Sequence, residues 1–244
     1  MRAFVSSLAL LLSTASAAVF PSSAAAQPGP VVILAPHPDD ETLGCGGLIA
    51  RRAAEGRRIV VVVLTDGRAL LRRFGVDRDP SEAEVSAMRK DETRRALDIL
   101  TDGRAELTFL DIENERLVDE QVAATARVTD LLRDLTPAEL YVTSPFEGHR
   151  EHLAANQIAR VACAATGSCG SIYEYIVSLK QGVSVDDLPR TRVGVDVSAY
   201  RDRERRALAQ FRSHLDIISP VLKAPLTPNY DRYLTDEEPF LVER

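Results

Sequence analysis

The chain has 244 residues, a length that suits one domain with a substantial buried core. Its 45% hydrophobic and 27% charged residues exclude disordered, collagen-like and coiled-coil classes. The formal net charge of −6 excludes the basic surface that binding to nucleic acid or to an anionic membrane requires, and it favours a neutral or cationic small substrate.

Residues 1–26 have the three-part pattern of a secretory signal peptide. Arg2 gives a positive start, residues 4–12 are mostly apolar, and Ala24-Ala25-Ala26 fits a small-residue cleavage site. The apolar stretch is too short for a membrane span. We therefore expect an exported protein, periplasmic or secreted, with no membrane span after cleavage.

After a linker at residues 27–30, residues 31–244 have the pattern of a single domain in which strands and helices alternate. Unbroken apolar runs rich in β-branched residues are typical of strands buried on both faces of a parallel sheet. Such runs predict strands at 31–35, 58–65, 106–112, 140–143, 172–179 and 192–197. Helices are predicted at 44–55, 81–100, 120–135, 151–165 and 200–214. The alternation predicts a doubly wound α/β fold with a mostly parallel sheet flanked by helices.

Two of the predicted strands run directly into segments rich in histidine and carboxylate. Strand 31–35 is followed by Pro36-His37-Pro38-Asp39-Asp40-Glu41, and strand 140–143 is followed by residues 144–152, which include His149 and His152. Ligand sites in open α/β sheets lie beyond the carboxyl ends of the strands, so these two segments should meet. The fourth histidine, on the last predicted helix, is expected to be exposed.

These residue types suit a catalytic zinc site, in which three protein ligands leave one position for water. His37 and Asp40 are three positions apart and can share one face of a turn, while His152 can arrive from the second segment. Asp39 is then free to take a proton from water. The spacing alone equally allows His149 to be the ligand in place of His152.

The segment Ala35-Pro36-His37-Pro38-Asp39-Asp40-Glu41, followed by Leu43-Gly44-Cys45-Gly46-Gly47, resembles the signature of the PIG-L/LmbE-like deacetylases. Pro36 is a small departure from the usual Ala-His-Pro-Asp-Asp-Glu. The second segment is similar to the family's His-x-Asp-His, with Glu151 in place of Asp. The resemblance extends over most of residues 31–215. It implies a Rossmann-like fold and hydrolysis of an N-acetyl group, often on a glucosamine unit.

Carried over to this chain, the resemblance implies one Zn²⁺ per chain, held by His37, Asp40 and His152. Other divalent metals are compatible with the same ligands. Asp39 becomes the general base. His149 becomes the group that stabilises the oxyanion, in its protonated form, or protonates the leaving amine.

Four further residues are assigned roles from the sequence. Arg89 matches a substrate-contacting arginine of relatives, although a plain helix-surface arginine is an equally good interpretation. Asn114 stands where some relatives carry Asp, and Glu147 where some carry Tyr, which suggests a sugar pocket of different shape with Asn114 in contact with the substrate. Glu151 is predicted to orient an imidazole from behind.

The cysteines fit an oxidising compartment. Cys163 and Cys169 lie in a short stretch rich in small residues, so we expect a local disulfide, with two buried thiols as the alternative. Cys45 is left unpaired.

The sequence thus predicts an exported, zinc-dependent de-N-acetylase that acts on a small molecule or glycan bearing an N-acetyl group. One alternative is an amidase of the same architecture that cleaves a larger amide conjugate. A second is a carbohydrate-binding protein without activity. Release of acetate separates the first interpretation from both alternatives.

Overall fold

The structure, a computed structural model, describes residues 29–76, 79–180, 182–227 and 229–242. The predicted signal peptide at residues 1–26 lies outside the described residues, as do positions 27 and 28 of the predicted linker. Within the described ranges no helix combines the length and the apolar character that crossing a membrane requires.

A seven-stranded sheet runs through the molecule. Its strands are β1 (Val31–Ala35), β2 (Ile59–Thr65), β3 (Glu106–Ile112), β4 (Glu139–Thr143), β5 (Ser171–Tyr175), β6 (Thr191–Asp196) and β9 (Glu237–Val242). Their order is β3-β2-β1-β4-β5-β9-β6. The five strands from β3 to β5 are parallel, and β9 is antiparallel to both of its neighbours. A separate ribbon pairs β7 (Ile218–Ser219) with β8 (Ala224–Pro225).

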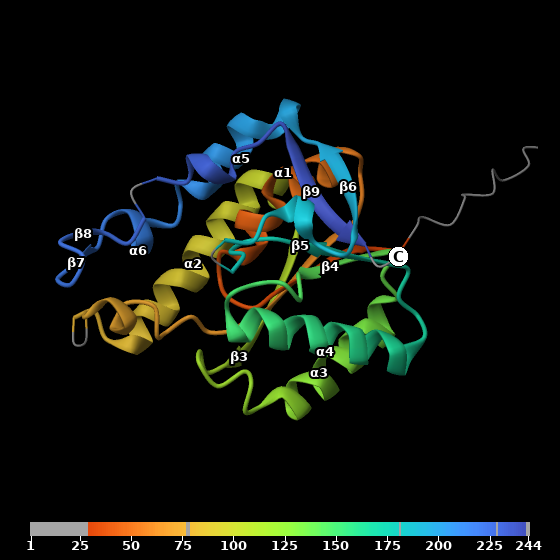
Figure 1. Ribbon diagram of the computed structural model, residues 1–244, viewed down its shortest axis with the longest axis horizontal. Helices are drawn as coiled ribbons and strands as arrows, with labels where there is room; N and C mark the ends of the chain where they lie inside the picture. Colours follow the sequence, from red (N-terminus) through yellow and green to blue (C-terminus); the bar gives the residue numbers. More distant parts are fainter. Residues whose placement is uncertain (1–28, 77–78, 181, 228, 243–244) are drawn as a thin grey trace, which may run out of the picture.

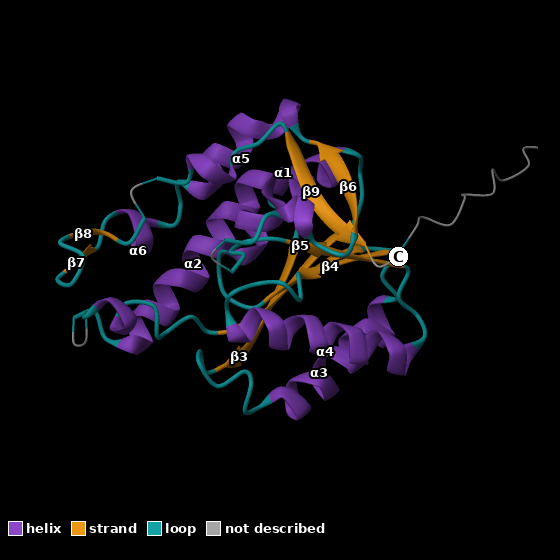
Figure 2. Cartoon of the chain, in the orientation of Figure 1, coloured by secondary structure: helices purple, strands orange, loops and turns teal. Residues whose placement is uncertain are grey.

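Helices cover both faces of this sheet (Figures 1 and 2). They are α1 (Asp40–Ala54), α2 (Glu82–Thr101), α3 (Gln121–Leu135), α4 (Arg150–Thr166), α5 (Arg201–Leu208) and α6 (Arg212–Leu215). Short 3₁₀ turns lie at Arg72–Phe74, Val185–Asp187, Ser198–Tyr200 and Asp231–Tyr233. Helices α1, α2 and α5 pack together on one face, and α3 packs on α4 on the other. The predicted doubly wound α/β class is therefore confirmed.

The side chains of β1, the central strand, point alternately to the two faces of the sheet, which explains why helices cover both faces. Every residue of β1 is buried. Val31 and Ile33 belong to the core beneath α1, whereas Val32 and Leu34 belong to the core beneath α4. Burying one such side chain stabilises the fold by about 1.5–3 kcal/mol, so a strand that is apolar at every position requires helices on both faces.

The prediction differs from the structure at two elements near the end of the chain. The helix predicted at residues 200–214 is wrong, because the chain breaks at Phe211, which has non-helical φ and ψ of −78° and 65°. Its ring is fully buried in the core, so packing overrides the helical pattern. Strand β9 was missed because its Glu237-Glu238-Pro239 start lacks the alternation of a strand.

The glycines after the first motif allow neighbouring elements to approach α1 closely. A Cβ on Gly44 would lie 2.2 Å from the ring of Tyr175, and one on Gly46 would lie 2.9 Å from Cγ of Glu204. The helix is kinked at Cys45, which has φ −143° and ψ 17°. Just after the kink, the backbone N–H groups of Gly47 and Leu48 donate to the carboxylate of Glu238 on β9, each over 2.8 Å.

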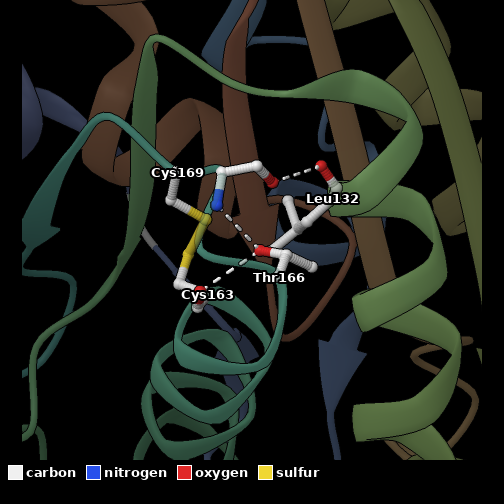
Figure 3. Close-up of a disulfide and its surroundings, with 5 residues drawn as sticks. Leu132, Cys163, Thr166 and Cys169 are labelled. Atoms are coloured by element: carbon white, nitrogen blue, oxygen red, sulfur yellow. Dashed lines mark hydrogen bonds between the residues drawn. A yellow bond between two sulfur atoms is a disulfide. The ribbon is translucent and has the colours of Figure 1, made fainter.

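A disulfide joins Cys163, near the end of α4, to Cys169 in the loop that follows (Figure 3). The helix ends at Gly167, whose left-handed φ of 62° turns the chain back toward Cys163. Ser168 Oγ donates to the carbonyl of Leu132, 3.5 Å away on α3. The loop is therefore tied to both helices of this face. Cys45 is free and buried.

The strand order reverses its direction at β1, which has β2 on one side and β4 on the other. In doubly wound sheets a crevice opens outside the carboxyl ends of the strands at such a reversal. The two histidine-containing segments follow β1 and β4, so they face each other across this crevice.

Candidate metal and catalytic site

Three ligand-type atoms from the two segments form a tight triangle. His37 Nδ1 lies 2.9 Å from Asp40 Oδ2, and His152 Nε2 lies 3.3 Å from each of these atoms. All three residues are at most 8% exposed. A metal ion bound at 2.0–2.1 Å with tetrahedral angles keeps its ligand atoms about 3.3 Å apart. The triangle therefore fits a metal with little rearrangement and leaves one coordination position open.

Carboxylates hold the outer side of both imidazoles. Glu151 Oε2 lies 2.9 Å from His37 Nε2, and Glu147 Oε2 lies 3.3 Å from His152 Nδ1. Such partners fix the orientation and tautomer of metal-binding histidines. Glu151 thus contacts an imidazole, as its sequence position suggested. The contact of Glu147 with His152 was missed, because the resemblance placed Glu147 only in the sugar pocket.

These two carboxylates are themselves held by neighbouring donors. The side-chain amide of Asn114 donates to Glu151 Oε2 over 2.7 Å. The backbone N–H groups of Val177 and Ser178 donate to Glu147 over 2.6 and 2.8 Å. Asn114 also lines the cavity in front of the triangle, so it combines this supporting contact with access to a ligand.

His149 lies beside the triangle in a different setting. With His37 and His152 it forms a looser set, whose ligand-type atoms lie within 4.8 Å of one another. Its Nε2 faces the Arg73 guanidinium at 2.8 Å, and its Nδ1 faces the backbone N–H of Glu151 at 3.3 Å. Burial and the neighbouring imidazoles lower the pKa of His149 to about 4. This setting favours a neutral ring, not the protonated form considered from the sequence.

Asp39 is the first residue of the turn that places Asp40, and its backbone is strained. Its φ of 130° lies in the left-handed region, which costs a non-glycine residue about 1–3 kcal/mol. Its side chain points away from the triangle, with Oδ1 2.9 Å from Arg89 Nη2 and Oδ2 3.4 Å from His214 Nε2. Burial raises the pKa of Asp39 to about 6, against the opposing effect of Arg89. A carboxylate with this pKa can accept a proton near neutral pH.

Arg89 is buried, with 3% of its surface exposed, so the interpretation as a helix-surface arginine is wrong. Besides its ion pair with Asp39, its guanidinium donates to the carbonyl of Pro38 over 2.5 Å and to that of Gly67 over 3.3 Å. Helix α2 thus supplies a cation that holds the loop after β1 in place. Arg89 also lines the cavity.

His214 was expected to be exposed, and that expectation is wrong. The break at Phe211 separates α6 from α5, and Ser213 then donates its N–H and its Oγ to Glu92, each over 2.7 Å. The side chain of His214 consequently faces the cavity and is only 12% exposed. Burial and the nearby Arg89 lower its pKa to about 3, so its ring is neutral. The helical periodicity of residues 200–214 did not indicate that His214 faces the cavity.

The cavity in front of these residues has a volume of about 520 Å³. Two segments far apart in the sequence form its outer wall: Leu70, Arg73 and Phe74 come from the loop after β2, and Leu226 and Thr227 follow β8. Ser219 of β7 donates to the carbonyl of Phe74 over 2.7 Å. Figure 1 shows the two segments projecting together beyond the sheet.

Comparison with known proteins identifies the family to which this site belongs. The profile of the PIG-L family, described as GlcNAc-PI de-N-acetylase, matches residues 32–163, a range that contains both segments. The uncharacterized deacetylase YaiS of Escherichia coli K12 is 30% identical over 139 residues, which cover 54% of this chain and 67% of that protein. The diacetylchitobiose deacetylase of Thermococcus kodakarensis is 29% identical over 140 residues, which cover 56% of this chain and half of that relative.

A solved structure supports the fold. The N,N′-diacetylchitobiose deacetylase from Pyrococcus horikoshii matches with a TM-score of 0.68 and 19% identity, over 87% of this chain and 82% of that chain. At this identity the likeness concerns the fold alone.

Proposed function

Because the chain belongs to the PIG-L family of GlcNAc-PI de-N-acetylases, we propose that it is a metal-dependent hydrolase that removes the acetyl group from an N-acetylated amino sugar. The observation that carries the proposal is the triangle of His37, Asp40 and His152, with the carboxylate of Asp39 beside it. Deacetylases among the relatives support the choice of an acetyl group.

The proposed metal is zinc, held by His37 Nδ1, Asp40 Oδ2 and His152 Nε2. Two imidazole nitrogens and one carboxylate oxygen are a common ligand set for catalytic zinc, and their spacing here fits it. When bound, the ion supplies Lewis acidity, which acidifies water and polarises the acetamide carbonyl. Glu151 and Glu147 keep the two rings oriented toward the metal position.

The chain's own residues then handle the protons and the developing charge. Asp39 accepts a proton from the attacking water while Arg89 holds its carboxylate in position. The proton passes to the nitrogen of the leaving amine when the tetrahedral adduct collapses to acetate and free amine. Arg73, whose guanidinium lies against His149, supplies positive charge on the side of the cavity where the oxyanion can form.

We also propose that the enzyme acts outside the cytoplasm. The support is the signal-peptide pattern of residues 1–26. A substrate at the cell surface or in the surrounding medium follows from this location.

The direct test is to incubate zinc-loaded protein with a panel of N-acetylated sugars and to measure acetate and free amine together. Equal amounts of both products are expected. A chelator should abolish the reaction, and added zinc should restore it. A carboxylic acid other than acetate would instead support the amidase alternative, and sugar binding without any hydrolysis would support the binding protein.

A further inference from the structure

Two more cavities adjoin the catalytic cavity, one on each face of the sheet. The first, of about 390 Å³, shares Arg73 and His149 with the catalytic cavity and continues toward the beginnings of α3 and α4. The second, of about 350 Å³, shares Leu43 and Arg232 with the catalytic cavity and continues along α1 to β9. Because the neighbouring cavities share these lining residues, and α3 and α4 cover one face of the sheet and α1 the other, we treat the three cavities as one groove that crosses the edge of the sheet. We call it the cross-sheet groove.

An open groove suits the chemistry of the proposed reaction. De-N-acetylation breaks the C–N bond of an exocyclic amide: the oxygen of water joins the acetyl carbon, and a proton joins the amine. The glycosidic bonds on both sides of the reacting sugar are untouched. A sugar inside a chain is therefore as reactive as a terminal one, and a groove open at both ends leaves room for its neighbours.

Each end of the cross-sheet groove carries an exposed arginine. Arg150 lines the end near α4, and Arg232 lines the end near β9. Among the described residues neither guanidinium has a carboxylate within 4.0 Å. Arg232 instead donates to the hydroxyl of Tyr233 over 2.7 Å and lies 4.7 Å from the centre of its ring. Both cations remain available to an anionic ligand.

The acidic residues that line the two end cavities of the groove are already engaged. Glu115 lies 2.9 Å from the guanidinium of Arg72. Glu151 contacts His37, and Glu238 accepts two backbone N–H groups of α1. Each end of the groove therefore presents one arginine without a carboxylate partner, although the whole chain carries a formal charge of −6.

Resting on the proposed function, we propose that the substrate is an acidic N-acetylated glycan that lies along the cross-sheet groove. Carboxylate-bearing sugars on both sides of the deacetylated unit would meet Arg150 and Arg232. A guanidinium binds a carboxylate through two parallel hydrogen bonds, which gives direction as well as charge complementarity. This proposal rests on the two arginines of the groove. It replaces the neutral or cationic substrate that the net charge of the whole chain favoured.

The test compares two series of oligosaccharides on the zinc-loaded protein. One is neutral, made of one to six N-acetylglucosamine units, and the other alternates N-acetylglucosamine with glucuronate at matched lengths. Acetate release gives kcat and KM, and mass spectrometry locates each free amine. We expect kcat/KM to rise with chain length, internal units to be deacetylated, and KM to be lower for the acidic series.

Charge-removing variants examine the arginines separately. Arg150→Gln and Arg232→Gln should each raise KM for the acidic series about two- to fivefold, the effect of an exposed ion pair, and should raise KM for the neutral series less. Arg133→Gln removes the same charge from the far end of α3, outside the groove, and should change neither series.

The outcomes separate the two proposals. Acetate from the short sugars with no gain from length, deacetylation confined to chain ends, or equal KM for the two series would overturn the acidic-glycan assignment and leave the deacetylase intact. Acetate from no sugar at all would contradict the proposed function. Calorimetry of the metal-free protein with the acidic hexamer still tests the groove in that case, with salt-sensitive binding expected and no binding overturning it.

Discussion

Two adjacent carboxylates in one buried turn have different partners. Asp40 Oδ2 faces the imidazoles of His37 and His152, whereas Asp39 faces Arg89 and His214. The strained φ of Asp39 causes this divergence, because it turns the chain sharply between the two side chains. One carboxylate is thereby available for a metal and the other for a proton.

The two candidate ligands of the second segment can be distinguished by metal content. His152→Ala should lose most of the zinc, because it removes one corner of the triangle. His149→Ala should retain near one zinc per chain, since both of its ring nitrogens face other groups. Elemental analysis of the two purified variants measures this, and the reverse pattern would move the ligand role to His149.

His214 is expected to act as a positioning residue for Asp39. Removal of a contact to a charged group costs about 1.5–3 kcal/mol in a buried setting. The distance from His214 Nε2 to Asp39 Oδ2 is long, at 3.4 Å, so we expect a cost near the lower end of this energy range. His214→Ala should therefore lower kcat by only about tenfold. Zinc content should not change, and His214→Gln should recover part of the loss because its amide can donate to Asp39. Equal activity of the alanine variant and the wild type would exclude this role.

The meeting of His37, Asp40 and His152 could be predicted because two short segments at the ends of neighbouring strands contain these residues. His214 and Glu147 could not be assigned in the same way. The position of His214 depends on the break at Phe211, which tertiary packing imposes. The role of Glu147 depends on the backbone after β5, whose N–H groups hold its carboxylate.

At the scale of elements, the contact of α5 and β9 with the kinked α1 buries two carboxyl groups. Glu204 is fully buried, and neither of its carboxyl oxygens has a hydrogen-bond partner among the described residues. Burial, with the nearby Glu238, raises the pKa of Glu204 to about 8. Burial also raises the pKa of Glu238 to about 7, against its two backbone N–H donors.

These raised pKa values predict a fold that weakens as pH rises. Between the ordinary glutamate pKa of 4.5 and about 8, the native state holds protons that the unfolded state has released. The contribution of these two groups to the free energy of unfolding should therefore fall across this range, by at most about 1.4 kcal/mol per pH unit for each group. Thermal unfolding at pH 5, 6, 7 and 8 measures the slope.

Glu204→Gln should flatten that slope, because the amide carries no titratable proton. Exposed Glu120→Gln is the matched control and should leave the slope as in the wild type. Equal slopes for Glu204→Gln and the wild type would argue against a protonated Glu204 at this contact.

The disulfide contributes stability to the α3–α4 face. It closes a loop with a sequence separation of only six, which in the chain-entropy account corresponds to about 2–3 kcal/mol. The double variant Cys163→Ser, Cys169→Ser should lose about this much free energy of unfolding in denaturant titrations. Treatment of the wild type with a reductant should reproduce the loss, and identical unfolding of reduced and oxidised protein would refute it.

Most elements could be predicted from the sequence because the central strands are apolar at every position. The predicted strand at residues 106–112 coincides with β3, and the predicted helix at residues 81–100 matches α2, which begins with a capping box at Ser81. The predicted start of α1 was four residues late. Its first turn contains Asp40 and Glu41, carboxylates that the sequence assigned to a motif rather than to a helix.

At the scale of the whole molecule, the reversal of strand order at β1 determines where chemistry is possible. It places segments about 115 positions apart, at His37 and His152, on the same edge of one sheet. The fold class and this meeting point follow from alternating strands and helices. The placement of Arg150 and Arg232 at the two ends of the groove does not follow from the sequence, because net charge carries no information about which arginines the fold brings together.

The central claim is that one carboxylate of the turn takes a proton while its neighbour holds the metal. Comparison of Asp39→Asn with Asp40→Asn, by zinc content and by initial rate of acetate release, tests it most directly. Asn tolerates a positive φ, so the Asp39 variant should keep the fold. It should hold zinc as the wild type does while turnover falls by roughly 10²–10⁴, or about 3–5 kcal/mol of barrier. Asp40→Asn should lose zinc and regain part of its activity in excess metal. Near-normal turnover of the Asp39→Asn protein would contradict the account.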